Sequence, residues 1–101
     1  MKIFNGGELK SAEFFSPKTT GRANVQMGTA VMKAHTEGDF DAHPGDEYSY
    51  ILSGKLICYT GDGEEYNVQA GDAIFTPAGQ KHKSKCISDE DCAVVWIEVA
   101  L

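Results

Sequence analysis

The chain has 101 residues, 42% of them hydrophobic, and a formal net charge of −6. This length suits one domain with a single small core, and the acidic balance disfavours nucleic acid because phosphate backbones are also negative. No apolar run approaches the roughly 20 residues that span a bilayer, and residues 1–7 lack the apolar stretch of a signal peptide, so we expect a cytoplasmic protein that binds neither nucleic acid nor a membrane.

The cysteine pattern agrees with a reducing compartment. The three cysteines are Cys58, Cys86 and Cys92, and they form no C-x-x-C unit. An odd number of cysteines argues against a complete disulfide framework. We therefore expect free thiols.

The first 23 residues mix apolar and turn-forming side chains. Phe14 and Phe15 form an apolar anchor, and the break at Pro17 follows it. An edge strand or an arm packing over the sheet is expected, with exchange between subunits and a lid over a ligand left open. Residues 24–35 are rich in β-formers and predict a strand, followed by a turn over residues 36–39. His35 is expected at the surface or at the rim of a cavity.

Potential metal ligands follow this turn. If Asp41 and His43 occupy positions i and i+2 of one strand, both side chains leave the same face. Pro44 and Gly45 favour a chain reversal. A three-residue loop would pair His43 with Glu47 on that face, so three donors would converge.

The strand that continues to residue 52 has two different faces. By alternation, one face points to the interior and the other carries large apolar groups outward. The inward residues are Glu47, Ser49 and Ile51, and the outward residues are Tyr48, Tyr50 and Leu52. The outward face favours association with another strand layer or another subunit.

Short strands separated by turns fill the rest of the chain. They are expected over residues 55–60, 64–68, 73–76 and 93–99. Residues 82, 84 and 86 share a face, which would place Cys86 deeper in the same cavity as His82. Many short strands, turns every 8 to 12 residues and no convincing helix predict a small all-β barrel.

Two spaced motifs resemble those of the cupin superfamily. The first cupin motif is His-x-His, three or four residues, Glu, six residues and Gly. Here Asp41, His43, Glu47 and Gly54 keep that spacing, with aspartate in place of the first histidine.

The second cupin motif is Gly, five residues, Pro-x-Gly, two residues, His, three residues and Asn. The matching residues are Gly71, Pro77, Gly79 and His82, with Cys86 where asparagine is usual. Together the two motifs cover residues 38–86. The resemblance implies a cupin-type double-stranded β-helix, or jelly-roll barrel, as one domain over residues 1–101. Residues 1–23 would be the N-terminal arm or edge strands, residues 24–101 the barrel, and the assembly a homodimer.

The resemblance also implies a metal site formed by Asp41, His43, Glu47 and His82. Two imidazoles and up to two carboxylates suit a divalent transition metal such as Fe, Mn, Ni, Co or Zn. Asp41 reaches less far than histidine, so it would bind the metal directly, bind it through water, or act as a base. Asp41 and Glu47 are the expected catalytic residues.

Two functions from different classes remain open. The first is a metal-dependent enzyme of the dioxygenase, isomerase or lyase type that acts on a small polar organic substrate in the barrel. The second is a non-catalytic small-molecule-binding or accessory cupin, because residues 46–56 and 70–79 look like those of ethanolamine-utilisation cupins as well as those of many uncharacterised cupins. The residues expected to line the pocket are Phe40, Ser49, Phe75 and Trp96.

Overall fold

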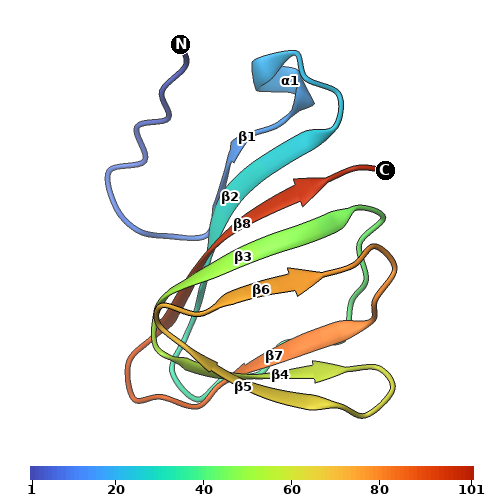
Figure 1. Ribbon diagram of the computed structural model, residues 1–101. Helices are drawn as coiled ribbons and strands as arrows, with labels where there is room; N and C mark the ends of the chain where they lie inside the picture. Colours follow the sequence, from blue (N-terminus) through green and yellow to red (C-terminus); the bar gives the residue numbers. More distant parts are fainter.

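The computed structural model describes residues 1–101 and is built almost entirely from β-strands (Figure 1). In chain order the elements are β1 (Ala12–Phe15), α1 (Pro17–Thr20), β2 (Val25–Met32), β3 (Asp46–Ser53), β4 (Lys55–Thr60), β5 (Glu65–Gln69), β6 (Ala73–Thr76), β7 (His82–Cys86) and β8 (Cys92–Val99). No helix of this protein is both long and apolar enough to cross a bilayer.

The strands form two antiparallel sheets. One has the order β1-β2-β8-β3-β6 and the other the order β5-β4-β7. Figure 1 shows the two sheets as facing layers that converge at the left and open toward the right. Strands that are distant in the sequence become neighbours, as when β2 pairs with β8 over eight residue pairs. The predicted all-β jelly-roll barrel is confirmed.

The alternation expected along β3 is also confirmed. Ile51 is 1% exposed, whereas Tyr48, Tyr50 and Leu52 are 43–49% exposed on the other side of the sheet. Because β3 lies between β8 and β6 in the ladder, its register fixes which side chains of both neighbours face inward.

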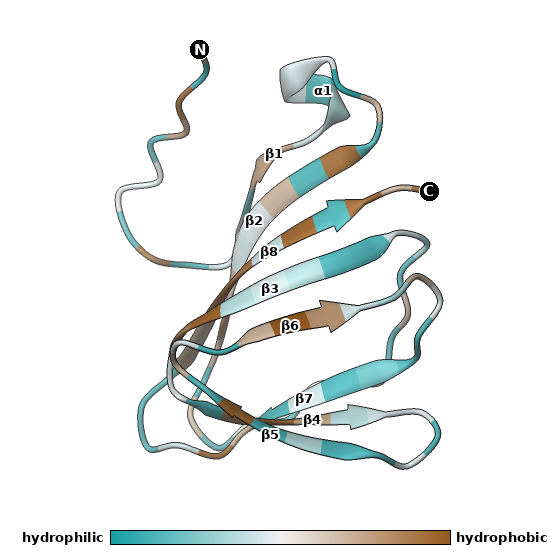
Figure 2. Ribbon diagram, in the orientation of Figure 1, coloured by the Kyte–Doolittle hydropathy of each residue, from teal (hydrophilic) through white to brown (hydrophobic).

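The buried core lies at the end where the sheets converge. Ile51, Leu56, Cys86 and Cys92 form its centre, all with side chains at most 4% exposed. Partly buried apolar residues pack around this cluster: Met32, Val68, Ile74 and Val94. The brown, hydrophobic segments of β3 and β8 at the left of Figure 2 mark this region.

The prediction of a hairpin that pairs His43 with Glu47 is wrong. Residues 37 and 41 instead make isolated antiparallel bridges to β7, where Asp41 and His82 exchange two backbone hydrogen bonds of 2.9 Å. The chain then bends at residues 44–45 and enters β3, which pairs with β6 and β8. This segment therefore passes from one sheet to the other. Proline and glycine favour a bend but do not determine which strand is reached next.

The helix α1 was not expected either. It is a single turn that begins with Pro17, whose missing N–H costs nothing at the first helical position. Gly21 ends it with φ of 74°, and its N–H donates to the carbonyl of Pro17. A single turn is too short for the apolar periodicity by which a helix is found in a sequence. Beside it, β1 pairs with β2 at the edge of the larger sheet.

A candidate metal centre in the barrel

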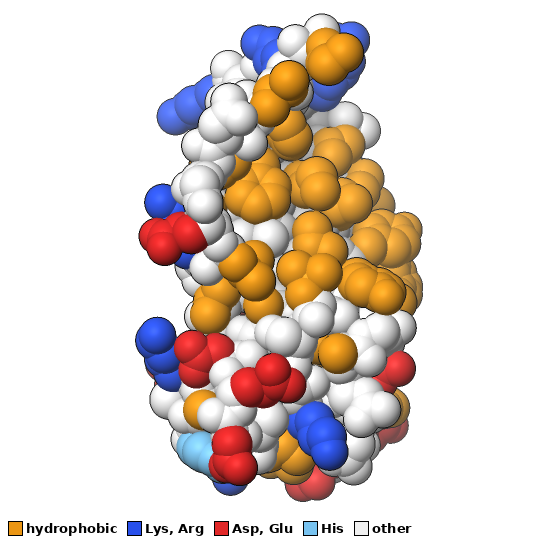
Figure 3. All heavy atoms as spheres, turned by 90° about the vertical axis from the view of Figure 1, so that its left-hand side faces the viewer, with side chains coloured by type: hydrophobic (Ala, Val, Ile, Leu, Met, Phe, Trp, Pro, Cys, Tyr) orange, Lys and Arg blue, Asp and Glu red, His pale blue; other side chains and the backbone are white.

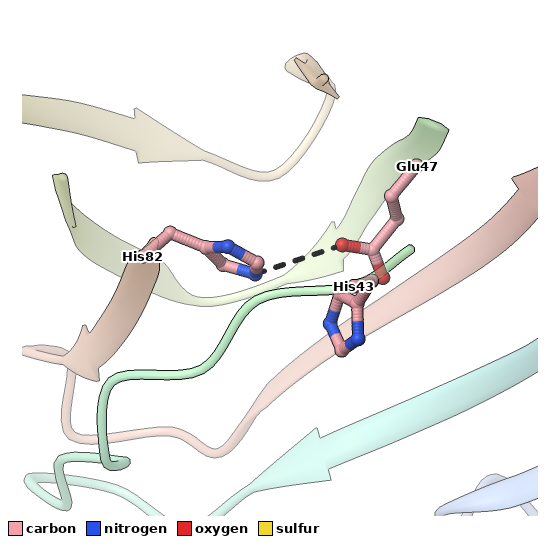
Figure 4. Close-up of side chains that lie close together, drawn as sticks. All are labelled: His43, Glu47 and His82. Atoms are coloured by element: carbon pink, nitrogen blue, oxygen red, sulfur yellow. Dashed lines mark ion pairs between the residues drawn. The ribbon is translucent and has the colours of Figure 1, made fainter. Parts of the chain in front are cut away.

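Three predicted ligands converge although they come from three different segments. His43 lies just before the bend, Glu47 is the second residue of β3, and His82 begins β7. One donor atom from each lies within 4.8 Å of the other two, and all three side chains are half-buried (Figure 4). The two imidazole rings are 5.2 Å apart between centroids.

The orientation of His82 suits a metal ligand. Its Nδ1 is 2.8 Å from the carbonyl oxygen of Gln80, and a carbonyl can only accept, so Nδ1 carries the proton. In the neutral ring the lone pair is then on Nε2, which lies 3.8 Å from Oε2 of Glu47. A metal-binding histidine is commonly held in this way through its other nitrogen.

Backbone contacts hold the bend that carries His43. The N–H of Gly79 donates to the carbonyl of His43 at 2.8 Å, which ties the bend to the loop before β7. The N–H of Gly45 donates to Oε1 of Glu98 at 3.3 Å, which ties it to β8. A Cβ on Gly45 would lie 2.5 Å from the carbonyl oxygen of Val99, so only glycine permits this close approach.

Asp41 and His35 lie outside the cluster. Asp41 is exposed, and its Oδ1 accepts the N–H of Ala42 at 2.8 Å. It is not among the residues whose donor atoms converge. His35 is exposed and has φ of 60°, and its Nε2 lies 2.8 Å from Oδ1 of Asp89. The converging set therefore has three members, two imidazoles and one carboxylate.

A cavity of about 590 Å³ opens beside these donors. Ser49 lines it as predicted. Phe75 contributes to its edge, but the Phe75 side chain packs against Tyr48 on the outer face, and Phe40 and Trp96 do not line the cavity. The prediction missed the contribution of β4 and β5, including Cys58, Thr60, Tyr66 and Val68. Alternation along β4 indicates which side chains share a face, but only the packing of the two sheets determines that this face meets the cavity.

The three thiols are all free. Burial raises the pKa of the Cys58 thiol, and Ser84 opposes this through a hydrogen bond. Burial raises the pKa of Cys92 to about 11. Burial also opposes ionisation of Cys86, but hydrogen bonds from Cys92 and Ser88 bring its pKa below the ordinary value. Cys86 belongs to the core rather than to the cavity wall.

The donor set fits a divalent transition metal. Two imidazole nitrogens and a carboxylate are ligands that Fe, Mn, Ni, Co and Zn accept. Nε2 of His82, which carries the lone pair of the neutral ring, lies 3.8 Å from the carboxylate of Glu47. Because the cavity adjoins all three donors, a bound molecule would meet such a metal directly.

Comparison with known proteins gives one family and many structures of similar fold. A family model described as "Cupin domain" matches residues 28–98. A polyketide synthase, CurC of Streptomyces cyaneus, is 27% identical over 92 residues; the match covers 90% of this chain but only 58% of that protein.

Two solved structures illustrate the similarity of fold. A Thermotoga maritima protein described as a predicted oxalate decarboxylase has a TM-score of 0.81 at 16% identity, covering 99% of this chain and 100% of that one. The EutQ protein of Clostridium difficile has a TM-score of 0.73 at 20% identity, covering 89% of this chain and 66% of that one. At these identities the likeness concerns the fold alone.

Proposed function

This chain belongs to the cupin domain family, and on that premise we propose that it binds one divalent transition metal through His43, Glu47 and His82. We further propose that it is an enzyme of the dioxygenase, isomerase or lyase type, acting on a small organic molecule in the barrel. The observation that carries this is the convergence of the three donor atoms within 4.8 Å beside a cavity of about 590 Å³.

The residues would have separate tasks. A bound metal would polarise a carbonyl or hydroxyl oxygen of the substrate. The two histidines would hold the metal as neutral imidazoles, and Gln80 would keep His82 in the required tautomer through its carbonyl. Glu47 would supply the negative charge, and its second oxygen is our candidate for moving a proton. Asp41 is left out of the set because it is not among the residues whose donor atoms converge.

Elemental analysis tests the metal site. We expect about one metal per chain in protein reconstituted with Fe, Mn, Ni, Co or Zn, and loss of about 10-fold or more in affinity in His43→Ala and His82→Ala. His35→Ala is the matched control, because this third histidine is exposed and lies outside the cluster. No bound metal after reconstitution, or equal loss in the control, would contradict the assignment.

A second candidate function is a non-catalytic cupin that binds a small molecule or serves as an accessory protein. The observation that favours it is the carboxylate of Asp41, which stands where the first motif has a histidine and lies outside the cluster. Removal of the metal separates the two functions. An enzyme of the proposed type loses turnover without metal, whereas a binding module keeps its ligand affinity.

We also propose that the protein is a cytoplasmic homodimer that covers the outer face of the larger sheet. Figure 3 shows hydrophobic side chains gathered across the middle of one side of the molecule. Neighbouring strands β3 and β6 carry exposed apolar residues on the outer face: Tyr48, Tyr50, Leu52 and Phe75. Sedimentation analysis of wild type and Tyr50→Lys tests this, because a buried lysine at the interface would shift the species from dimer to monomer.

A further inference from the structure

The strand register divides the inward residues of the barrel into layers. Residues that pair directly across two antiparallel strands point to the same side, and the next inward residue lies two positions further along. The rim layer contains the pairs Glu47–Thr76 and Thr60–His82, the middle layer Ser49–Ile74 and Cys58–Ser84, and the floor layer Ile51–Val94 and Leu56–Cys86. From Glu47 to Ile51 the strand advances about 13 Å, at roughly 3.3 Å per residue.

The middle layer combines small and large side chains. Ile74 and Trp96, which both pair with Ser49, are large, and Trp96 does not line the cavity. Ser49 comes from one sheet, and Cys58 and Ser84 come from the other, where their side chains lie 3.7 Å apart. The three small side chains all line the cavity and fill little of the space between the sheets. The cavity volume of about 590 Å³ equals that of on the order of 20 water molecules at about 30 Å³ each. A two-carbon dicarboxylate would leave most of this volume unfilled.

The floor below this layer is apolar. Ile51 and Leu56 are at most 4% exposed and close the bottom of the cavity. Met32, Val68 and Val94 join them in the wall. A polar group pushed to this depth would lose its water without gaining a hydrogen-bond partner, whereas an apolar group would gain by leaving water.

The charges on the cavity wall disfavour an anionic ligand. Lys83 is the only lysine or arginine in the wall. Its Nζ lies 3.2 Å from Oε2 of Glu37 and 4.8 Å from the ring centre of Phe40, so it is already paired. Asp62 and Glu64 also contribute to the wall and are negative. A second carboxylate on a ligand would find no free cation there.

From these features we propose that the cavity takes a largely apolar molecule of aromatic size whose single oxygen-bearing head faces the rim donors, an inference that rests on the proposed function. The head belongs beside His43, Glu47 and His82, and the apolar body extends through the open middle layer toward Ile51 and Leu56. This replaces the small polar substrate expected from the sequence. Its chemical class is an aromatic or polycyclic ketone, phenol or enol.

The test uses 1-hydroxy-2-acetonaphthone as the probe, because it joins a naphthalene body to neighbouring hydroxyl and ketone oxygens. Its binding to metal-loaded and metal-free protein is followed by fluorescence, with oxalate as the small dianionic competitor. Ser49→Phe and Ser84→Phe each fill the middle layer from a different sheet and leave the three donors in place. Ile87→Ser, at an exposed apolar residue outside the cavity and outside the proposed dimer face, is the matched control for binding at the exposed apolar surface.

We expect the probe to bind and oxalate not to displace it. Both filling variants should weaken probe binding about tenfold or more, since added volume in a packed site causes strain. Both variants should still bind the metal and unfold in a cooperative melting transition. The control should bind as wild type does. Binding that survives in both folded filling variants, or that disappears in the control, would overturn the proposal.

Failure of the proposed function would give a different result. If no metal binds but the probe still enters the cavity and both filling variants exclude it, the ligand class stands and the metal function fails. If metal binds and oxalate displaces the probe, or binds when the probe does not, the metal function stands and the apolar ligand class is overturned.

Discussion

Gly54 offers a sharp test of how the closed end of the barrel is built. It joins β3 to β4 with φ of 85°, and a Cβ placed there would lie 2.4 Å from Sγ and 2.9 Å from Cα of Cys92. Gly63, between β4 and β5, has a similar φ of 95° but no atom within 4 Å of its Cβ position. The two glycines therefore share the backbone conformation and differ in packing. Substitution of each by alanine separates these two effects.

The expected losses of stability follow from this comparison. Alanine in the left-handed region costs about 1–2 kcal/mol, which is the whole effect expected for Gly63→Ala. Gly54→Ala bears the same strain and must also displace the backbone of β8 at Cys92. Overpacking of this kind adds about 1–3 kcal/mol, for a total of roughly 2–5 kcal/mol. That total is a large part of the roughly 5–15 kcal/mol by which a whole domain is typically stable.

Urea unfolding followed by the fluorescence of Trp96 measures both losses. We expect the midpoint of Gly54→Ala to lie well below that of Gly63→Ala, with similar slopes. The metal donors lie at the other end of β3, so the folded fraction of Gly54→Ala should keep its metal affinity. Equal losses in the two variants would refute the close packing of Gly54 against β8.

Three further predictions concern Glu98, Asp91 and the three thiols. Glu98→Ala frees the bend that carries His43, so metal affinity in a titration should fall about 10-fold while the protein stays folded; unchanged affinity would remove Glu98 from this role. The hydrogen bond from Ala34 and the charge of Lys33 lower the pKa of Asp91 in the folded protein. The contribution of Asp91 to the free energy of unfolding is therefore fully present above the pKa of the unfolded chain, and it is lost as the pH falls through the lower pKa of the folded protein. Urea unfolding should show a cost for Asp91→Asn at neutral pH that shrinks below about pH 4; a cost independent of pH would contradict this. Because burial raises the pKa of Cys58 and hides the other two thiols, a thiol reagent should react slowly with native protein and rapidly after unfolding; rapid reaction of the native protein would contradict this.

The strands were largely predictable because glycine and proline mark their ends. β4 and β6 lie at the expected residues, and alternation identified the inward and outward sides of β3. These features depend on local backbone preferences and on a period of two.

The path between the sheets was not predictable from local signals. Pro44 and Gly45 suit a hairpin as well as a bend, and the pairing of Asp41 with His82 depends on a strand about 40 residues later. The cavity wall combines residues of both sheets, so its composition could not be predicted from any one strand. The spacing of His43 and Glu47 nevertheless selected two residues whose donor atoms lie close together in the structure.

A crystal structure of the metal-reconstituted protein with anomalous scattering tests the metal site most directly. We expect one anomalous peak in the barrel, about 2.0–2.2 Å from a nitrogen of His43, a nitrogen of His82 and an oxygen of Glu47, with Asp41 outside this distance. A peak bound instead at His35 and Asp89, or no peak in the barrel of reconstituted protein, would contradict the proposed metal centre.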